Sequence, residues 1–225
     1  MIVLVANLGS TSFKYKLFDM SKGEAVLAQG AADRVGLNAS AWSITLGDGQ
    51  KLEGDGVTLA DHGAAIELHL SKLLEAGAID RLDALDAIGF KAVHGGPISG
   101  AVPVDDHVIE TMEQFADVAP AHNPPYIAAM RAFRSKLPGV PQVAAFETAF
   151  HQTIPLARQA YAVPYEWIED LGVRRYGFHG ASHRYIATRM AEVAPDVKRL
   201  INCHLGGSSS LCAIHEGKSV ATSMG

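Results

Sequence analysis

The stretch "ANLGSTSFKYKLFD", residues 6–19, follows an apolar start at residues 1–5 and decides the fold of the first part of the chain. From residue 13 onward, apolar side chains alternate with lysines, which is the period-two pattern of a strand with one buried face. The small residues between the two apolar stretches are typical of a tight turn. The sequence therefore predicts a strand, a tight turn and a second strand.

The residues of this turn offer N–H groups and hydroxyls that an anion can use: Gly9, Ser10, Thr11 and Ser12. A Walker A loop needs a glycine directly before its lysine, whereas Phe13 precedes Lys14 here, and a dinucleotide fingerprint needs G-x-G-x-x-G at the start of a helix. Neither motif fits. Two interpretations stay open: a phosphate-binding turn with Lys14 as a point charge, or an ordinary hairpin whose Ser and Thr suit the turn.

A second stretch, "NCHLGGSSSLCAIHEG" at residues 202–217, repeats this design after another apolar strand. Leu8-Gly9 aligns with Leu205-Gly206, and Ser12 aligns with Ser209. A similarity this short is weak when taken alone. Two such units far apart in the chain nevertheless favour two related lobes, each presenting a small-residue turn to one polyphosphate.

The composition sets limits on function. The chain has 225 residues, 48% of them hydrophobic and 19% charged, which suits one large or two small globular domains. A net charge of −5 without clustered Lys and Arg argues against a nucleic-acid partner. The apolar runs are too short to span a membrane, and no basic region precedes the apolar N-terminus, so we expect a cytoplasmic protein with no membrane partner.

The two cysteines, Cys203 and Cys212, would lie on opposite sides of the second turn without CxxC spacing. This arrangement favours buried, reduced thiols over a metal site or a disulfide.

The remaining pattern alternates strands with helices, which predicts an α/β fold with a mixed sheet. We expect further strands at residues 24–31, 42–46, 87–93, 140–146 and 199–204, and helices at 65–76, around 108–115, from the prolines of "AHNPP" to Phe133, and at 182–194. No low-complexity linker separates them. The loop at residues 150–155 is the expected domain boundary.

Polar residues gather where these elements end, which is where ligands bind in α/β sheets: His94, His122, Asn123, Glu147, His151, Arg174, Arg175, His179 and His183. Each histidine also has a structural interpretation as a hydrogen-bonded residue. His179 and His183 lack the Glu of H-E-x-x-H, which argues against a zinc site. Four further histidines, His62, His69, His107 and His215, are interpreted as surface or structural residues.

Seven motifs together resemble one family: "VANLGSTSFKYKLFD", "AVHGGP", "VAPAHNPP", "FETAFHQTIP", "RRYGFHGASH", "CHLGGSSS" and "ATSMG". Their order and spacing are similar to those of the acetate kinases, the acetokinase family of carboxylate kinases in the actin, sugar kinase and heat-shock ATPase superfamily. The resemblance spans essentially the whole chain. It implies an actin-like ATPase (ribonuclease H-like) fold of duplicated mixed-sheet lobes, with residues 1–149 as the first lobe and 150–225 as the incomplete start of a second, nucleotide-binding lobe.

The resemblance also implies a reaction and a site. The family transfers the γ-phosphoryl group of ATP to acetate, giving acetyl phosphate and ADP, with magnesium or manganese, and it suggests a homodimer. Matched by motif, the catalytic residues are Glu147 and His179; the substrate is bound by Lys91, Val93, Ala121 and Phe178; ATP is bound by Ser10, Ser12, Lys14, His204, Leu205, Gly206, Gly207 and Ser208; and Asn7 lies near the metal.

The chain departs from the family pattern at site positions: Lys91 replaces Arg, Glu147 replaces Asp, Gly207-Ser208 replaces Asn-Gly, and Ala121 replaces Leu. Three interpretations therefore stay open: an acetate kinase, a kinase for propionate or butyrate, and a divergent nucleotide-binding member that has lost phosphoryl transfer. The chain also stops before the regions that supply a second catalytic arginine and the adenosine pocket in the family. The isolated 225 residues are accordingly expected to have little kinase activity.

Overall fold

A computed structural model describes all 225 residues, and the chain divides into two compact units. Unit 1 comprises Met1–Gly95 and Ala101–Ala145, and unit 2 comprises Gly96–Gly100 and Phe146–Gly225. Each unit is described by itself.

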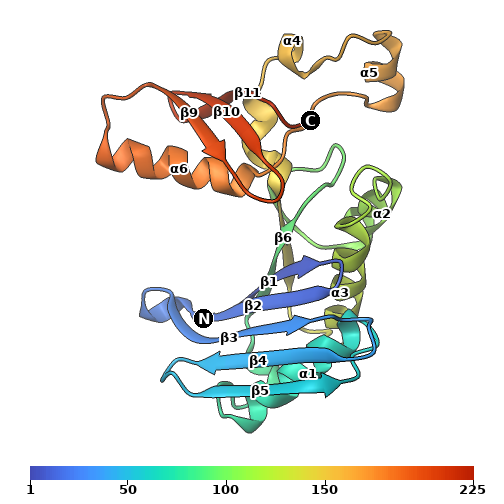
Figure 1. Ribbon diagram of the computed structural model, residues 1–225, viewed down its shortest axis with the longest axis vertical. Helices are drawn as coiled ribbons and strands as arrows, with labels where there is room; N and C mark the ends of the chain where they lie inside the picture. The colour runs from blue at the N-terminus through green and yellow to red at the C-terminus, as the bar shows by residue number, and fades with distance from the viewer. The chain divides into compact units, whose positions relative to one another are not determined.

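Unit 1 is built on an eight-stranded sheet in the order β5-β4-β3-β2-β1-β6-β8-β7. Figure 1 shows β5 to β1 side by side in this order. Its strands are β1 (Ile2–Gly9), β2 (Ser12–Asp19), β3 (Ala25–Asp33), β4 (Ser40–Leu46), β5 (Lys51–Val57), β6 (Ala87–Ala92), β7 (Ala101–Pro103) and β8 (Gln142–Phe146). The first five strands pair antiparallel, whereas β6 runs parallel to β1, so the expected mixed sheet is confirmed. Sequence analysis missed β5 and β7, because two glycines weaken the β pattern of the former and the latter is only three residues long.

The helices of unit 1 are α1 (His62–Glu75), α2 (Asp106–Gln114) and α3 (Asn123–Lys136), with short 3₁₀ turns at η1 (Met20–Lys22) and η2 (Leu82–Ala84). Asp61 caps α1 by accepting a hydrogen bond from the N–H of Ala64 at 2.8 Å, and prolines occupy the first turn of α3, as predicted. Phe133 of α3 contacts Phe13 and Phe90 on one face of the sheet. That face therefore holds the core of unit 1.

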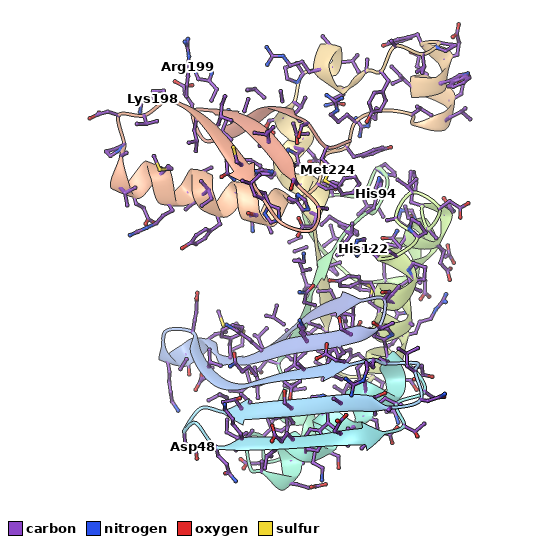
Figure 2. All side chains as sticks on the ribbon, viewed as in Figure 1. Asp48, His94, His122, Lys198, Arg199 and Met224 are labelled. Atoms are coloured by element: carbon purple, nitrogen blue, oxygen red, sulfur yellow. The ribbon has the colours of Figure 1, made fainter.

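The alternation predicted for β2 is confirmed. Phe13, Tyr15 and Leu17 are buried, and the lysines between them are exposed on the opposite face, which we call the open face. In the turn that joins β4 to β5, marked by Asp48 in Figure 2, the aspartate carboxylate accepts a hydrogen bond from the N–H of Gln50 at 2.9 Å.

Unit 2 contains a three-stranded antiparallel sheet of β9 (Arg199–His204), β10 (Ser210–His215) and β11 (Lys218–Thr222), in the order β11-β10-β9. The long helix α6 (Gly180–Val193) packs on this sheet through Ala187, which joins Cys212 and Ile214 in a small core. The remaining elements are η3 (Glu147–Thr153), α4 (Leu156–Gln159) and α5 (Glu166–Leu171).

Three expectations for unit 2 need correction. The segment expected as a loop at residues 150–155 is in the 3₁₀ helix η3 as far as Thr153, and the helix expected from residue 182 begins at Gly180. Cys203 is exposed rather than buried, because β9 points it away from α6, whereas Cys212 is buried as predicted. None of the helices in either unit has the length and apolar character needed to cross a bilayer.

Candidate active site

In unit 1, the candidate residues lie in a row across the open face of three neighbouring strands. Asn7 of β1 is the direct cross-strand partner of Lys14 of β2. On the other side of β1, Ala6 pairs with Phe90 in parallel register, so the following residues, Asn7 and Lys91, lie side by side on the open face. The row Lys14–Asn7–Lys91 thus places an amide between two exposed cations. Such a row suits a ligand with several negative charges.

The turn beside this row is tight. Gly9 and Ser12 are the last paired residues, so only Ser10 and Thr11 connect the strands, and both are exposed. The carbonyl of Gly9 lies 3.0 Å from Nε2 of the buried His62, which fixes the turn from the core side. The hydroxyls of Ser10 and Thr11 are therefore exposed at the end of the β1–β2 hairpin, next to the contact between Gly9 and His62.

Asn7 is also positioned from α3. The Tyr126 hydroxyl accepts a hydrogen bond from the N–H of Leu8 at 3.1 Å and donates one to Oδ1 of Asn7 at 3.0 Å. Since an amide oxygen has two lone pairs, Oδ1 keeps one for another partner. Tyr126 was not among the sequence candidates, because only the packing of α3 brings it to the end of β1.

The proposed substrate-pocket residues of unit 1 are on two loops. Val93 directly follows β6 and is half-buried, and Ala121 is exposed between α2 and α3. The buried Asn123 connects these loops, since its Nδ2 donates to the carbonyls of His94 and Met112, each at 2.9 Å. The role of Asn123 is thus to hold the loop after β6 against the loop that carries Ala121.

The two histidines in these loops, both labelled in Figure 2, have different environments. His94 is fully buried and stacks on Phe115, with ring centroids 5.2 Å apart. His122 is exposed and precedes the first turn of α3. The burial of His94 is consistent with the structural interpretation of that residue.

In unit 2, the candidate site begins where the chain enters α6. His179 has the left-handed backbone conformation, with φ of 57°, which is uncommon for a residue with a side chain. Neighbouring glycines permit close packing: a Cβ on Gly177 would lie 2.5 Å from the His151 ring, and a Cβ on Gly180 would collide with the carbonyl oxygen of Glu147. The strained residue His179 is therefore held between two tight contacts.

The ring of His179 is surrounded by polar groups of the second hairpin. Its Nδ1 lies 2.9 Å from Oγ of Ser210, and its Nε2 lies 3.0 Å from Oγ of Ser208. The His204 ring stacks on it at a tilt of 30°, with centroids 4.0 Å apart, and is itself anchored by Ser182 at 3.0 Å. Three of the predicted residues, His179, His204 and Ser208, are thus brought together.

The other predicted residues of unit 2 adjoin this group. Glu147 is buried at the start of η3, directly after β8, and Phe178 is half-buried next to His179. The loop from Leu205 to Ser209 is exposed, and a Cβ on Gly207 would meet nothing within 4 Å. The loop is therefore exposed, with open space beside the Cα of Gly207.

Arg174 and Arg175, which were candidates from the sequence, line a separate cavity of about 220 Å³ in unit 2. Arg174 donates to Oε1 of Gln159 at 2.9 Å and lies over the Tyr176 ring, and Arg175 lies over the Tyr161 ring. The pair therefore packs against aromatic rings beside the candidate site.

Two buried histidines lie behind His179. The pKa of His183 is lowered to about 4, mainly by burial and to a smaller extent by the neighbouring His151, His179 and His204. Burial also lowers the pKa of His151, although its hydrogen bond to the Phe178 carbonyl opposes the shift. Both rings are therefore neutral at neutral pH. The sequence signalled them only through their positions after "FETAF" and within "HGASH".

The sequence profile of the Acetokinase family matches residues 2–225. This chain belongs to the acetokinase family. The match covers both units, so the row on the open face and the group around His179 both lie in segments shared with the family. The expected actin-like fold class agrees with this assignment.

Curated relatives of this acetokinase-family chain include the acetate kinase of Phocaeicola vulgatus, 47% identical over 233 residues, and that of Anoxybacillus flavithermus, 42% identical over 227 residues. These matches cover 100% and 99% of the chain but only 58% and 56% of the relatives. Among solved structures, the acetate kinase of Porphyromonas gingivalis has 40% identity and a TM-score of 0.87, and a propionate kinase of Francisella tularensis has 32% identity and a TM-score of 0.89. Each covers the whole chain, which spans 57% of that structure.

Proposed function

We propose that the protein is a carboxylate kinase that reversibly transfers the γ-phosphoryl group of ATP to acetate, giving acetyl phosphate and ADP. The observation that carries this proposal is the row Lys14–Asn7–Lys91 on the open face of unit 1, in a chain whose relatives are named acetate kinases. Two cations flanking an amide suit a site that holds a polyphosphate next to a carboxylate.

The reaction needs alignment and charge compensation more than covalent chemistry. A carboxylate oxygen of acetate attacks the γ-phosphorus, an O–P bond forms, the bond to the β-phosphate oxygen breaks, and no proton has to move. Lys91 holds the carboxylate of acetate, and Lys14 offsets charge on the phosphates. His179 donates a hydrogen bond to the transferring group, at the position where its Nε2 now meets Ser208.

The other predicted site residues bind the substrate or the phosphates of ATP. From the family resemblance we assign Val93, Ala121 and Phe178 to the methyl group of acetate, and Glu147 as the active-site carboxylate. The turn residues Ser10 and Ser12 and the loop from His204 to Ser208 bind the phosphates of ATP. The exposure of residues 205–208 supports this role, because an exposed loop can turn its N–H groups toward an anion.

The donor set fits magnesium or manganese. The free lone pair of Asn7 Oδ1 is a hard oxygen ligand, and magnesium is usually held by one or two protein groups together with waters and substrate phosphates. When bound with the nucleotide, the ion neutralises charge on the phosphate oxygens. Asn7 would hold it on the open face. From the family resemblance we also propose a cytoplasmic homodimer.

Propionate is a second candidate substrate, favoured by Ala121. This residue is exposed on its loop and replaces the leucine of the family, which leaves room for a longer acid, and one solved relative is a propionate kinase. Each additional buried CH₂ can contribute up to about 0.8 kcal/mol, close to a fourfold gain in kcat/KM. Propionate should match or exceed acetate, and Ala121→Leu should restore the preference for acetate. An acetate preference that Ala121→Leu leaves unchanged would remove this residue from the specificity argument.

A hydroxamate assay for acetyl phosphate tests the proposal. Because the chain spans about 57% of its relatives, the assay compares the 225-residue protein with a chimera that adds the unmatched C-terminal part of the Phocaeicola vulgatus enzyme. The chimera should form acetyl phosphate from ATP, acetate and magnesium, at a rate roughly 10³-fold above that of the 225 residues. A folded chimera that binds ATP but transfers no phosphoryl group to acetate, propionate or butyrate would favour the divergent, inactive interpretation.

A further inference from the structure

Beside His179 lie buried polar groups that the proposed reaction does not use. His183 is fully buried on α6, and Ser210 is buried at the start of β10. A hydrogen-bonded chain runs through them from Asn202 of β9 to His179. The chain joins four side chains and ends on the ring of His179, a proposed catalytic residue. One role should therefore account for all of them.

The direction of this chain follows from its first member. Nδ2 of Asn202 can only donate, so Nδ1 of His183, at 2.8 Å, is an acceptor. A neutral imidazole with an acceptor at Nδ1 carries its hydrogen on Nε2, and that N–H donates to Oγ of Ser210 at 2.8 Å. Burial keeps His183 neutral by lowering its pKa to about 4. Each ring nitrogen of His183 therefore has one defined role.

The remaining steps set the state of His179. Because Ser210 accepts from His183, its single hydroxyl hydrogen is free to donate to Nδ1 of His179 at 2.9 Å. His179 then carries its hydrogen on Nε2, which faces Oγ of Ser208 at the exposed end of the site. The opposite tautomer would present a lone pair there, and a lone pair repels an anionic phosphoryl oxygen.

We propose that Asn202, His183 and Ser210 are positioning residues that hold His179 in the Nε2–H tautomer and disfavour a second proton on its Nδ1. The inference rests on the proposed function, in which His179 donates from Nε2. A proton on Nδ1 would leave the Ser210 hydroxyl facing two N–H donors, with no acceptor for its own hydrogen. Leaving a buried donor without a partner is unfavourable, so this arrangement disfavours the second proton.

Other titratable groups also face His179 and contribute to its charge state. His204 stacks on its ring from β9, and His151 and Glu147 approach from η3. These neighbours act through space, whereas Ser210 contacts Nδ1 directly. A variant that removes only the hydroxyl separates the two effects.

A second chain in the same unit supplies a matched control. Nε2 of His151 donates to the Phe178 carbonyl at 2.9 Å, so its Nδ1 accepts from the hydroxyl of Ser219 at 2.8 Å. Ser219 is as deeply buried as Ser210. This chain ends on the carbonyl of Phe178, directly before His179, whereas the chain through Ser210 ends on Nδ1 of the His179 ring.

Long-range ¹H–¹⁵N spectra of the histidine rings, recorded over a pH series on the ¹⁵N-labelled 225-residue protein, test the proposal without requiring kinase activity. In the unmodified protein, His179 should show a protonated Nε2 and a hydrogen-bonded acceptor at Nδ1. Ser210→Ala should raise the pH midpoint of His179 protonation by about one unit. Ser210→Thr, which keeps a hydroxyl, should restore it, and Ser219→Ala should leave it unchanged.

Three results would overturn the proposal: a protonated Nδ1 in the neutral ring of the unmodified protein, an unchanged midpoint in Ser210→Ala, or an equal shift in Ser219→Ala. If Ser210→Ala does not fold, the tautomer in the unmodified protein and the Ser210→Thr variant still decide the matter. In the active chimera, Ser210→Ala should lower kcat more than it changes KM and move the acid limb of the pH–rate profile upward. A chimera without kinase activity would contradict the proposed function and leave the spectra as the test of the tautomer.

Discussion

The hairpins β1–β2 and β9–β10 have similar sequences but form their turns differently. Between β1 and β2 only Ser10 and Thr11 are unpaired, whereas five residues, 205–209, connect β9 to β10. The aligned leucines show the consequence: Leu8 is 3% exposed within its strand, and Leu205 is 77% exposed in its loop. The same motif thus forms a tight two-residue turn in unit 1 and a longer, exposed loop in unit 2.

A buried histidine lies beneath each hairpin, and the surroundings of the two histidines differ. In unit 1, His69 lies among the rings of Phe13, Tyr15 and Trp42, with one hydrogen-bond partner, the Tyr15 hydroxyl at 3.3 Å. In unit 2, His183 has hydrogen-bond partners at both ring nitrogens. The first hairpin is therefore supported by apolar packing and presents its polar groups on a strand face. The second depends on a polar network for its geometry.

The largest expected effect concerns the side chain beside each hairpin that we propose to contact the phosphates. In the active chimera, Lys14→Ala and His179→Ala should each lower kcat/KM by a factor of about 10² or more, because we propose that both groups act mainly on the transition state. Circular dichroism should show that both variants are folded.

Matched controls exist for both variants. Lys16→Ala removes an exposed lysine from the same face of β2, and His215→Ala removes an exposed histidine from β10. Each control should change kcat/KM by less than about threefold. A loss in Lys16→Ala equal to that in Lys14→Ala would mean that only the general field of the open face matters, and an unchanged rate in His179→Ala would make that residue structural.

A second prediction compares two glycines of unit 2. A Cβ on Gly180 collides with the carbonyl oxygen of Glu147, whereas a Cβ on Gly207 meets nothing. Gly180→Ala should therefore lower the free energy of unfolding by about 3 kcal/mol, and Gly207→Ala should leave it nearly unchanged. Urea unfolding followed by the fluorescence of Trp167, the one tryptophan of unit 2, measures both. Equal free energies of unfolding in the two variants would show that the backbone at the start of α6 adjusts to the added methyl group without loss of stability.

The smallest expected effect is a pH dependence of unit 1. Burial lowers the pKa of His69 to about 4, below the value of about 6.5 in an unfolded chain. Between these two values the unfolded chain binds a proton that the folded chain does not bind. The free energy of unfolding should therefore fall as the pH drops through this window, by on the order of 2 kcal/mol, and be fully regained above it.

Urea unfolding followed by Trp42 measures this dependence, since the Trp42 ring lies 6.1 Å from that of His69, and Trp167→Phe removes the second signal. In His69→Leu, the fall in stability over this pH window should largely disappear. If the fall persists in that variant, other groups titrate on unfolding and His69 is not its source.

Local pattern was sufficient for much of the fold. The alternation in residues 13–19 predicted which side chains of β2 are buried, and the prolines of "AHNPP" predicted the start of α3. The pattern failed where tertiary contacts replace local preference. β5 forms despite its glycines because β4 supplies its hydrogen bonds, and Cys203 is exposed because the single helix α6 covers one face of β9.

For the candidate site too, some residues could be identified from the sequence and others only from the structure. Its motif residues, such as Lys14 and His179, were identified from the sequence, since their motifs are long and specific to the family. The residues that orient them were not identified: Tyr126 meets Asn7 only because α3 packs beneath the sheet, and Ser210 meets His179 only because β10 lies against the start of α6. Periodicity and motifs report which residues occur and which face of an element they share. The direction of a hydrogen bond between distant segments depends on how those segments pack, and only the tertiary structure decides it.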